Sequence, residues 1–235
     1  GSSIAREADN TIYIWAGPEI AVATTKAFTS QVAVLYTLAL RLAIDRKTIS
    51  DERANSLAEA MKSLPDVVAK TLTDDRIALY QHLASLNRSK HDFFIIGRGQ
   101  DYAAGCEGAM KIKEVSYLHC ESYAAGELKH GTISLIEDGT LVVALGTYGP
   151  LFDKAMSNVV EVKARGASVL ALTTESRREE MAKNADAMMV IPDTEDMFLP
   201  SLGVLPLQLF AYYVALQRGC DIDKPRNLAK SVTVE

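Results

Sequence analysis

The chain has 235 residues, of which 48% are hydrophobic and 23% charged, and its formal net charge is −5 at pH 7. This composition suits one sizeable globular unit or two small ones. The charges are interspersed and form no basic stripe, which disfavours nucleic acid as a partner. Three cysteines without metal-type spacing disfavour a disulfide framework and a bound metal, so we expect reduced, buried thiols at Cys106, Cys120 and Cys220.

No charged segment followed by an apolar core stands at the start of the chain, so we expect no signal peptide. One uncharged stretch, 197–217, is long enough to raise the question of a membrane span. Two prolines and two glutamines interrupt it, which is typical of a buried helix with its lead-in loop. The sequence therefore predicts a cytoplasmic protein without a membrane partner.

The first ninety residues predict only one strand, over 11–15, followed by a long apolar helix over 24–44. Thr24 or Thr25 is a plausible N-cap of that helix. Two amphipathic helices follow, over 50–71 and 75–86, with no strand between them. Because one strand cannot form a sheet alone, we expect residues 1–90 to be the end of a larger domain with connecting helices.

From residue 92 onward, short β-rich runs alternate with helical runs. This alternation predicts an α/β fold, a doubly wound parallel sheet with flanking helices, over residues 91–220. Residues 221–235 form a polar C-terminal tail. The expected strands cover 93–96, 141–145, 168–172 and 187–191, and the expected helices cover 101–119, 152–164, 176–184 and 204–218.

The predicted helix over 101–119 is the best candidate site. Glu107, Lys111 and Glu114 lie at i, i+4 and i+7, which puts all three on one stripe of a helix that is otherwise mostly apolar. Charged groups on a buried helix must be paired or functional. An ordinary intrahelical ladder and a catalytic site both fit, and in the second case Glu114 could act as a general base.

Two further residues carry chemistry in one interpretation and none in the other. His130 lies in a short polar segment between glycines, which suits either proton shuttling or plain exposure. Lys230 lies in the tail and could form a Schiff base with a sugar carbonyl or simply be solvated. An attacking lysine must be neutral, so the catalytic interpretation predicts a partly desolvated pocket around it.

A Gly-Arg-Gly turn over 97–99 follows a predicted strand and invites comparison with a dinucleotide-binding fingerprint. That motif needs a further glycine where this chain has Tyr102, so the motif fails and we expect no cofactor. A tight turn that feeds the next helix explains these residues.

Five segments together resemble the sugar-isomerase (SIS) part of the glutamine:fructose-6-phosphate amidotransferases, the glucosamine-6-phosphate synthase family. The resemblance spans the chain and implies an SIS-type fold, in which a complete second subdomain is preceded by the C-terminal remnant of a first. The segments are 1–9 (GSSIAREAD), 16–31 (AGPEIAVATTKAFTSQ), 96–131, 206–211 (PLQLFA) and 225–235 (PRNLAKSVTVE).

The resemblance also implies an activity, the conversion of fructose 6-phosphate to glucosamine 6-phosphate as the first step of hexosamine synthesis. In the family, an N-terminal glutaminase domain releases the required ammonia from glutamine, and the enzyme is a homodimer. Neither that domain nor the hydroxyl-rich phosphate-binding loop of the first subdomain occurs in this sequence. We therefore expect catalytic groups without the phosphate site, and impaired activity for this chain alone.

By the same resemblance, Lys230 forms the Schiff base with the open-chain ketose, and Glu114 moves a proton between C1 and C2. His130 opens the sugar ring, acting from the neighbouring subunit, and Lys111 supports the charge that develops on the sugar. The sugar pocket is lined by Val22, Thr24 and Ala229, with Glu19 nearby.

Two substitutions depart from the family pattern. Thr24 stands where serine is common, which keeps the hydroxyl, and Ala21 stands where glycine is common, which narrows the turn. Two other classes remain as alternatives, a stand-alone SIS deglycase or isomerase for an amino-sugar phosphate and a regulatory SIS domain that senses sugar phosphates. A sensor needs the pocket but not Lys230 together with Glu114.

Overall fold

A computed structural model gives the structure of the protein and describes residues 2–230. Its centre is a five-stranded sheet in the order β2-β1-β3-β4-β5, and every neighbouring pair of strands is parallel. The strands are β1 (Asp92–Gly97), β2 (His119–Ala124), β3 (Leu141–Gly146), β4 (Ser168–Thr174) and β5 (Ala187–Ile191).

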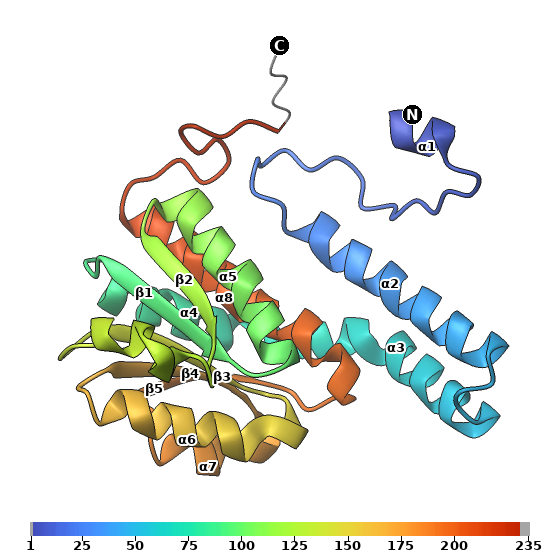
Figure 1. The fold of residues 1–235 in the computed structure, drawn as a ribbon. Helices are drawn as coiled ribbons and strands as arrows, with labels where there is room; N and C mark the ends of the chain where they lie inside the picture. Colours follow the sequence, from blue (N-terminus) through green and yellow to red (C-terminus); the bar gives the residue numbers. More distant parts are fainter. Residues whose placement is uncertain (1, 231–235) are drawn as a thin grey trace.

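Helices cover both faces of this sheet, as Figure 1 shows. Phe93 and Ile95 of β1 belong to the apolar cluster on the face of α4, α5 and α8, whereas Phe94 and Ile96 belong to the cluster under α6. This alternation explains why β1 reads as a continuous apolar run, and it confirms the doubly wound α/β fold. The helices are α4 (Asp74–Asn87), α5 (Gln100–Ser116), α6 (Phe152–Lys163), α7 (Arg178–Ala182) and α8 (Leu199–Gln217).

Short 3₁₀ turns complete the second part of the chain. They are Leu128–His130, Thr132–Leu135, Gly149–Leu151, Glu175–Arg177 and Asp196–Phe198.

The first part of the chain consists of α1 (Ser3–Glu7), α2 (Lys26–Asp45) and α3 (Asp51–Thr71). Figure 1 shows α2 and α3 side by side, extending away from the sheet. The predicted strand over 11–15 is wrong, because no strand occurs between residues 2 and 91. A strand needs a hydrogen-bonded neighbouring strand, and within the described part of the chain no strand pairs with residues 11–15.

The predicted helix over 101–119 is three residues too long, since α5 ends at Ser116. Tyr117 follows in the left-handed conformation (φ 61°), and the chain then enters β2, a strand that the sequence pattern did not predict. α8 begins at Leu199 rather than at residue 204, because a proline is tolerated in the first turn of a helix. The helix expected over 176–184 is a 3₁₀ turn followed by the short α7.

Within residues 2–230, two helical segments, Lys26–Asp45 and Asp196–Gln217, could cross a membrane by length and composition only. The second contains α8, which packs against α4 and α5 in the core, in agreement with the prediction of a buried helix. The three cysteines are free, as expected, but only Cys120 is buried and Cys106 is exposed, which corrects the expectation of three buried thiols.

Candidate active site

The charged stripe predicted from helical spacing exists on α5. Lys111 is only 4% exposed, and its Nζ lies 2.6 Å from Oε2 of Glu114 and 3.5 Å from Oε1 of Glu107. Burial raises the pKa of the Glu107 carboxyl above its ordinary value, although the Lys111 charge opposes this shift. A buried lysine between two carboxylates meets the requirement that buried charge be paired, and it leaves the cluster formally acidic by one unit.

A cavity of about 200 Å³ opens beside Lys111. Gln208 of α8 also lines it, and the buried Nε2 of this side chain has no hydrogen-bond partner within the described residues. An unsatisfied amide next to a charged cluster is what a polar ligand would complete. The lining residues come from α5, α8 and two loops, and they are Ala21, Ala23, Thr25, Lys111, Val115, Gln208, Ala211, Tyr212, Ile222 and Asp223.

The tail brings Lys230 to the rim of this cavity. Its Nζ donates a hydrogen bond of 2.6 Å to the carbonyl of Ala21, a cavity-lining residue, and lies 3.5 Å from Oε2 of Glu19. The Lys230 side chain is 47% exposed, so about half of it is shielded from solvent, and the partly desolvated pocket stays a prediction. The lysine forms an ion pair with the Glu19 carboxylate, and solvent reaches its side of the pair.

Glu19 holds the start of α2. Its Oε1 accepts hydrogen bonds from the backbone N–H of Thr25 (2.9 Å) and from the Thr25 hydroxyl (3.3 Å). Partial burial raises the pKa of Glu19, but these backbone hydrogen bonds and the Lys230 charge together lower it below its ordinary value. Thr25 is the N-cap residue by position, yet its side chain makes no capping bond and donates to the Glu19 carboxylate instead.

The two loops around the cavity are joined to each other and to α5. The N–H of Val22 donates to the carbonyl of Asp223 (2.9 Å), and the N–H of Arg226 donates to the hydroxyl of Tyr117 (2.7 Å). The Asp221 carboxylate accepts hydrogen bonds from the backbone N–H groups of Asp223 and Lys224, which fixes the shape of this turn. Sequence reasoning missed Tyr117 and Asp223, although the Asp-x-Asp-Lys-Pro run is typical of a turn.

Other predicted site residues lie apart from the cavity. Val22 and Thr24 are partly buried, and they alternate along the loop with the three residues that line the cavity, Ala21, Ala23 and Thr25. Ala229 is exposed. His130 ends an exposed 3₁₀ turn beyond β2. None of the hydrogen bonds or ion pairs of the described residues joins its side chain to the cavity.

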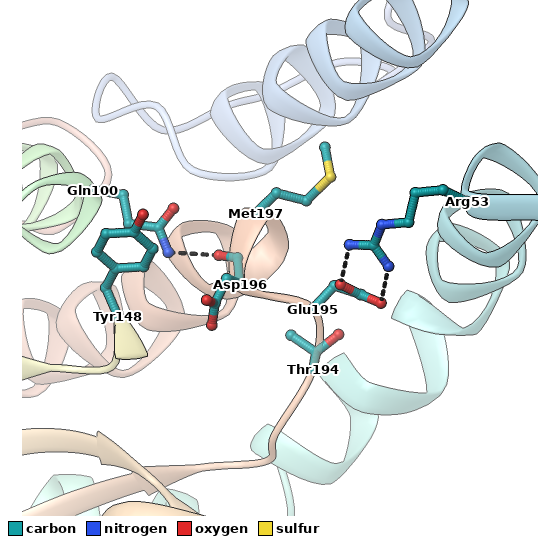
Figure 2. Close-up of a pocket in the computed structure, with 7 residues that line it drawn as sticks. All are labelled: Arg53, Gln100, Tyr148, Thr194, Glu195, Asp196 and Met197. Carbon is teal, nitrogen blue, oxygen red and sulfur yellow. Dashed lines mark hydrogen bonds and ion pairs between the residues drawn. The ribbon is translucent and has the colours of Figure 1, made fainter. Parts of the chain in front are cut away.

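A second, larger cavity of about 570 Å³ lies at the carboxyl edge of the sheet (Figure 2). Gln100 follows β1 and Tyr148 follows β3, and the chain order reverses between these two strands, which is where open α/β sheets generally bind ligands. Figure 2 shows Arg53 of α3 pairing with Glu195 through both carboxylate oxygens, at 2.8 and 2.7 Å. None of the residues predicted to be catalytic lines this cavity.

Asp101 holds the loops beside this second cavity. Its buried carboxylate accepts the N–H groups of Thr147 (2.9 Å) and Tyr148 (3.0 Å) and the Thr147 hydroxyl. Burial raises the pKa of Asp101, although these hydrogen bonds oppose the shift. The residue joins the first turn of α5 to the end of β3, which suits a structural role.

Comparison with known proteins agrees with this architecture. Glutamine–fructose-6-phosphate aminotransferase (isomerizing) of Clostridium tetani is 52% identical over 235 residues, all of this chain and 38% of that protein. The C-terminal domain of glucosamine-fructose-6-phosphate aminotransferase from Francisella tularensis is a solved structure that matches with a TM-score of 0.90 and 34% identity, over 95% of this chain and 63% of that one. The structure of glucosamine-6-phosphate deaminase from Thermotoga maritima matches with a TM-score of 0.73 and 26% identity, over 99% and 64%.

The chain thus spans 38% of the length of the curated relatives it matches. A family model described as the SIS domain matches residues 1–41 and 85–218. These two segments make up more than half of the chain, with α3 between them. The chain belongs to the SIS domain family.

Proposed function

We propose that the chain is the isomerase half of a glutamine:fructose-6-phosphate aminotransferase, a cytoplasmic enzyme that makes glucosamine 6-phosphate. The name shared by the curated relatives supports this proposal, since each covers the whole chain. The observation that carries it is the position of Lys230, whose amine bonds to the same loop that lines the Lys111 cavity.

The chemistry begins at Lys230. An amine adds to the C2 carbonyl of open-chain fructose 6-phosphate, and loss of water leaves an imine. Because Lys230 is ion-paired, it must first lose a proton, and Glu19 at 3.5 Å is a carboxylate that can take it. Ammonia then replaces the lysine on C2, which gives the substrate nitrogen and frees the amine for the next turnover.

Isomerisation requires a proton to leave C1 and another to reach C2. Glu114 is the proposed base, because it contacts Lys111, a residue that lines the cavity, and its side chain is 25% exposed. Lys111 holds Glu114 through the 2.6 Å contact and would stabilise negative charge that develops on the sugar. The unsatisfied amide of Gln208 is available to a sugar hydroxyl in the same cavity.

The domain organisation that we propose assigns residues 1–90 to the end of a first SIS subdomain, 91–220 to the second and 221–235 to the catalytic tail. Ser231–Glu235 lie outside the described residues. In support, α2 buries none of its residues here, although it is apolar along its length. The rest of the first subdomain, an N-terminal glutaminase domain and a second subunit of a homodimer are the proposed partners. The exposure of His130 fits a role in the neighbouring subunit.

The test of this function is covalent trapping. In the protein extended to the length of its relatives, fructose 6-phosphate plus borohydride should leave a reduced sugar adduct on Lys230. Lys230→Arg should abolish both the adduct and the turnover, because a guanidinium stays protonated and cannot add to a carbonyl. Mass spectrometry of tryptic peptides locates the adduct. An adduct on another lysine, or full turnover in Lys230→Arg, would exclude the assignment.

A second candidate is an SIS enzyme that removes nitrogen from an amino-sugar phosphate. The match to the Thermotoga maritima protein, whose name is glucosamine-6-phosphate deaminase, favours it. The two candidates differ in the reaction that they catalyse. An aminotransferase makes glucosamine 6-phosphate with glutamine as the nitrogen source, whereas the second enzyme releases nitrogen from an amino-sugar phosphate. A regulatory SIS domain would bind the sugar phosphate without forming the adduct.

A further inference from the structure

We propose that Tyr117 and Arg226 form a latch that fastens the catalytic tail to α5, so that Tyr117 is a positioning residue for the amine of Lys230. This inference rests on the proposed function for its consequence, but not for its geometry. The latch consists of the Tyr117 side chain and the backbone and side chain of Arg226.

The first observation is the backbone of Tyr117. The residue is the C-cap of α5 in the left-handed conformation (φ 61°, ψ 18°). Glycine is the usual residue at such a helix end, since any other side chain brings a steric cost there. A tyrosine is uncommon in this conformation, and the contacts of its side chain offset the steric cost.

Two contacts join that side chain to one residue of the tail. The Tyr117 hydroxyl accepts a hydrogen bond from the backbone N–H of Arg226 at 2.7 Å. The Arg226 guanidinium lies over the Tyr117 ring, 4.2 Å from its centroid. Because one contact holds the backbone and the other holds the side chain, together they restrain both the position and the orientation of the tail.

The latch connects the two halves of the proposed chemistry. Tyr117 follows Glu114 by three residues at the end of the same helix, and Arg226 precedes Lys230 by four residues in the tail. Between them the chain turns, with Asn227 at a φ of 66° and the N–H of Leu228 on the carbonyl of Pro225. Lys230 is then held at its far end by Ala21. The latch therefore sets where the amine stands relative to the base.

The first arm of the test does not depend on the activity. Hydrogen exchange of the Arg226 amide is measured by NMR in this chain. Tyr117→Phe removes only the acceptor hydroxyl, so this amide should exchange about fivefold faster, the factor expected for one ordinary hydrogen bond. Tyr102→Phe is the matched control, an exposed tyrosine at the other end of α5, and should leave the exchange unchanged. Unchanged exchange in Tyr117→Phe would overturn the latch.

The second arm measures turnover and trapping in the longer protein. Tyr117→Phe and Arg226→Ala should lower kcat and the rate of adduct formation on Lys230 by roughly 10- to 100-fold, since small displacements of a reacting group cost this much. KM for fructose 6-phosphate should change less, because the latch holds the amine and not the sugar. Arg226→Lys, which keeps the charge and the backbone N–H, should recover part of the loss. Lys224→Ala removes a nearby tail charge without touching Tyr117 and should behave as wild type.

The two arms separate the two ways of failing. Wild-type kcat in both Tyr117→Phe and Arg226→Ala would overturn the positioning role. A wild-type protein that forms no adduct on Lys230 would contradict the proposed function, while faster amide exchange in Tyr117→Phe would still establish the latch.

Discussion

Two of the cavities in this chain differ in size and in chemistry, and the smaller one is lined by Lys111 and by the loop that binds the Lys230 amine. The cavity at the carboxyl edge of the sheet measures about 570 Å³, against about 200 Å³ beside Lys111. In the larger cavity Arg53 and Glu195 form an ion pair through both carboxylate oxygens. In the smaller, the buried Gln208 amide lacks a partner among the described residues. We therefore place the proposed site by its unsatisfied polar group rather than by cavity volume.

Glu114→Gln tests the smaller cavity most strongly. The amide keeps the shape of the side chain but cannot accept a proton, so turnover in the longer protein should fall by roughly 10²- to 10⁴-fold. The borohydride adduct on Lys230 should still form, because Schiff-base formation does not use this base. Glu121→Gln, on β2, is the matched control. Normal turnover in Glu114→Gln would remove this residue from the mechanism.

Gly97→Ala tests how much the tight turn before α5, the helix that contributes to both cavities, adds to the stability of the fold. A Cβ at this position would lie 2.7 Å from the backbone C of Asp101 and from the backbone N of Tyr102, so the start of α5 must shift. We expect a loss of about 1 to 3 kcal/mol in the free energy of unfolding, as for overpacked interiors. Urea denaturation measures it. Gly203→Ala, which meets only ordinary contact at 3.6 Å, is the control and should be neutral.

Acid should loosen the loop at the rim of the smaller cavity. The folded-state pKa of Glu19 is lowered, so its stabilisation is present above the ordinary value and is lost as pH falls through the lowered one. The contribution should stay below about 1 kcal/mol, because Lys230 is exposed. Urea denaturation of wild type and Glu19→Gln, from neutral pH to about pH 3, measures it. A Glu19→Gln variant with the same pH dependence as wild type would contradict the prediction.

Arg53→Ala tests whether the larger cavity takes part in the reaction, and we expect no effect on adduct formation. The substitution breaks the ion pair with Glu195 in the larger cavity and removes nothing from the smaller. Adduct formation on Lys230 should therefore proceed at the wild-type rate. A slower reaction would mean that the sugar, or part of it, occupies the larger cavity.

The central fold was predictable because its parallel strands are buried on both faces. β1, β3 and β4 read as apolar runs between turns, and their helices follow at the expected intervals. β2 was not predicted because it is an edge strand in which only Cys120 is buried, so its sequence contains no apolar run. The strand expected over 11–15 reflects the opposite error, since an apolar pattern does not supply a neighbouring strand.

The site was predictable as far as local spacing reaches. Helical periodicity was enough to bring Lys111 to Glu114, and the structure confirms that contact. The bond from Lys230 to Ala21 joins residues 209 positions apart, so no sequence window contains it. The same holds for Arg226 and Tyr117, which are 109 positions apart. The resemblance named Lys230 and Glu19 as site residues, and their mutual contact is a finding of the structure.

The exposed segment before α2 gives the protein an optical reporter of its own. Trp15 is the single tryptophan of the chain and is 91% exposed. The Tyr13 ring lies in an edge-on arrangement beside it, with the two ring centroids 6.4 Å apart. The tryptophan fluorescence of the chain therefore comes only from this exposed indole, and no tryptophan in the buried sheet contributes to it. Any protein surface that covers this segment moves the indole out of water and shifts its emission to shorter wavelength, so assembly can be followed by light without a label.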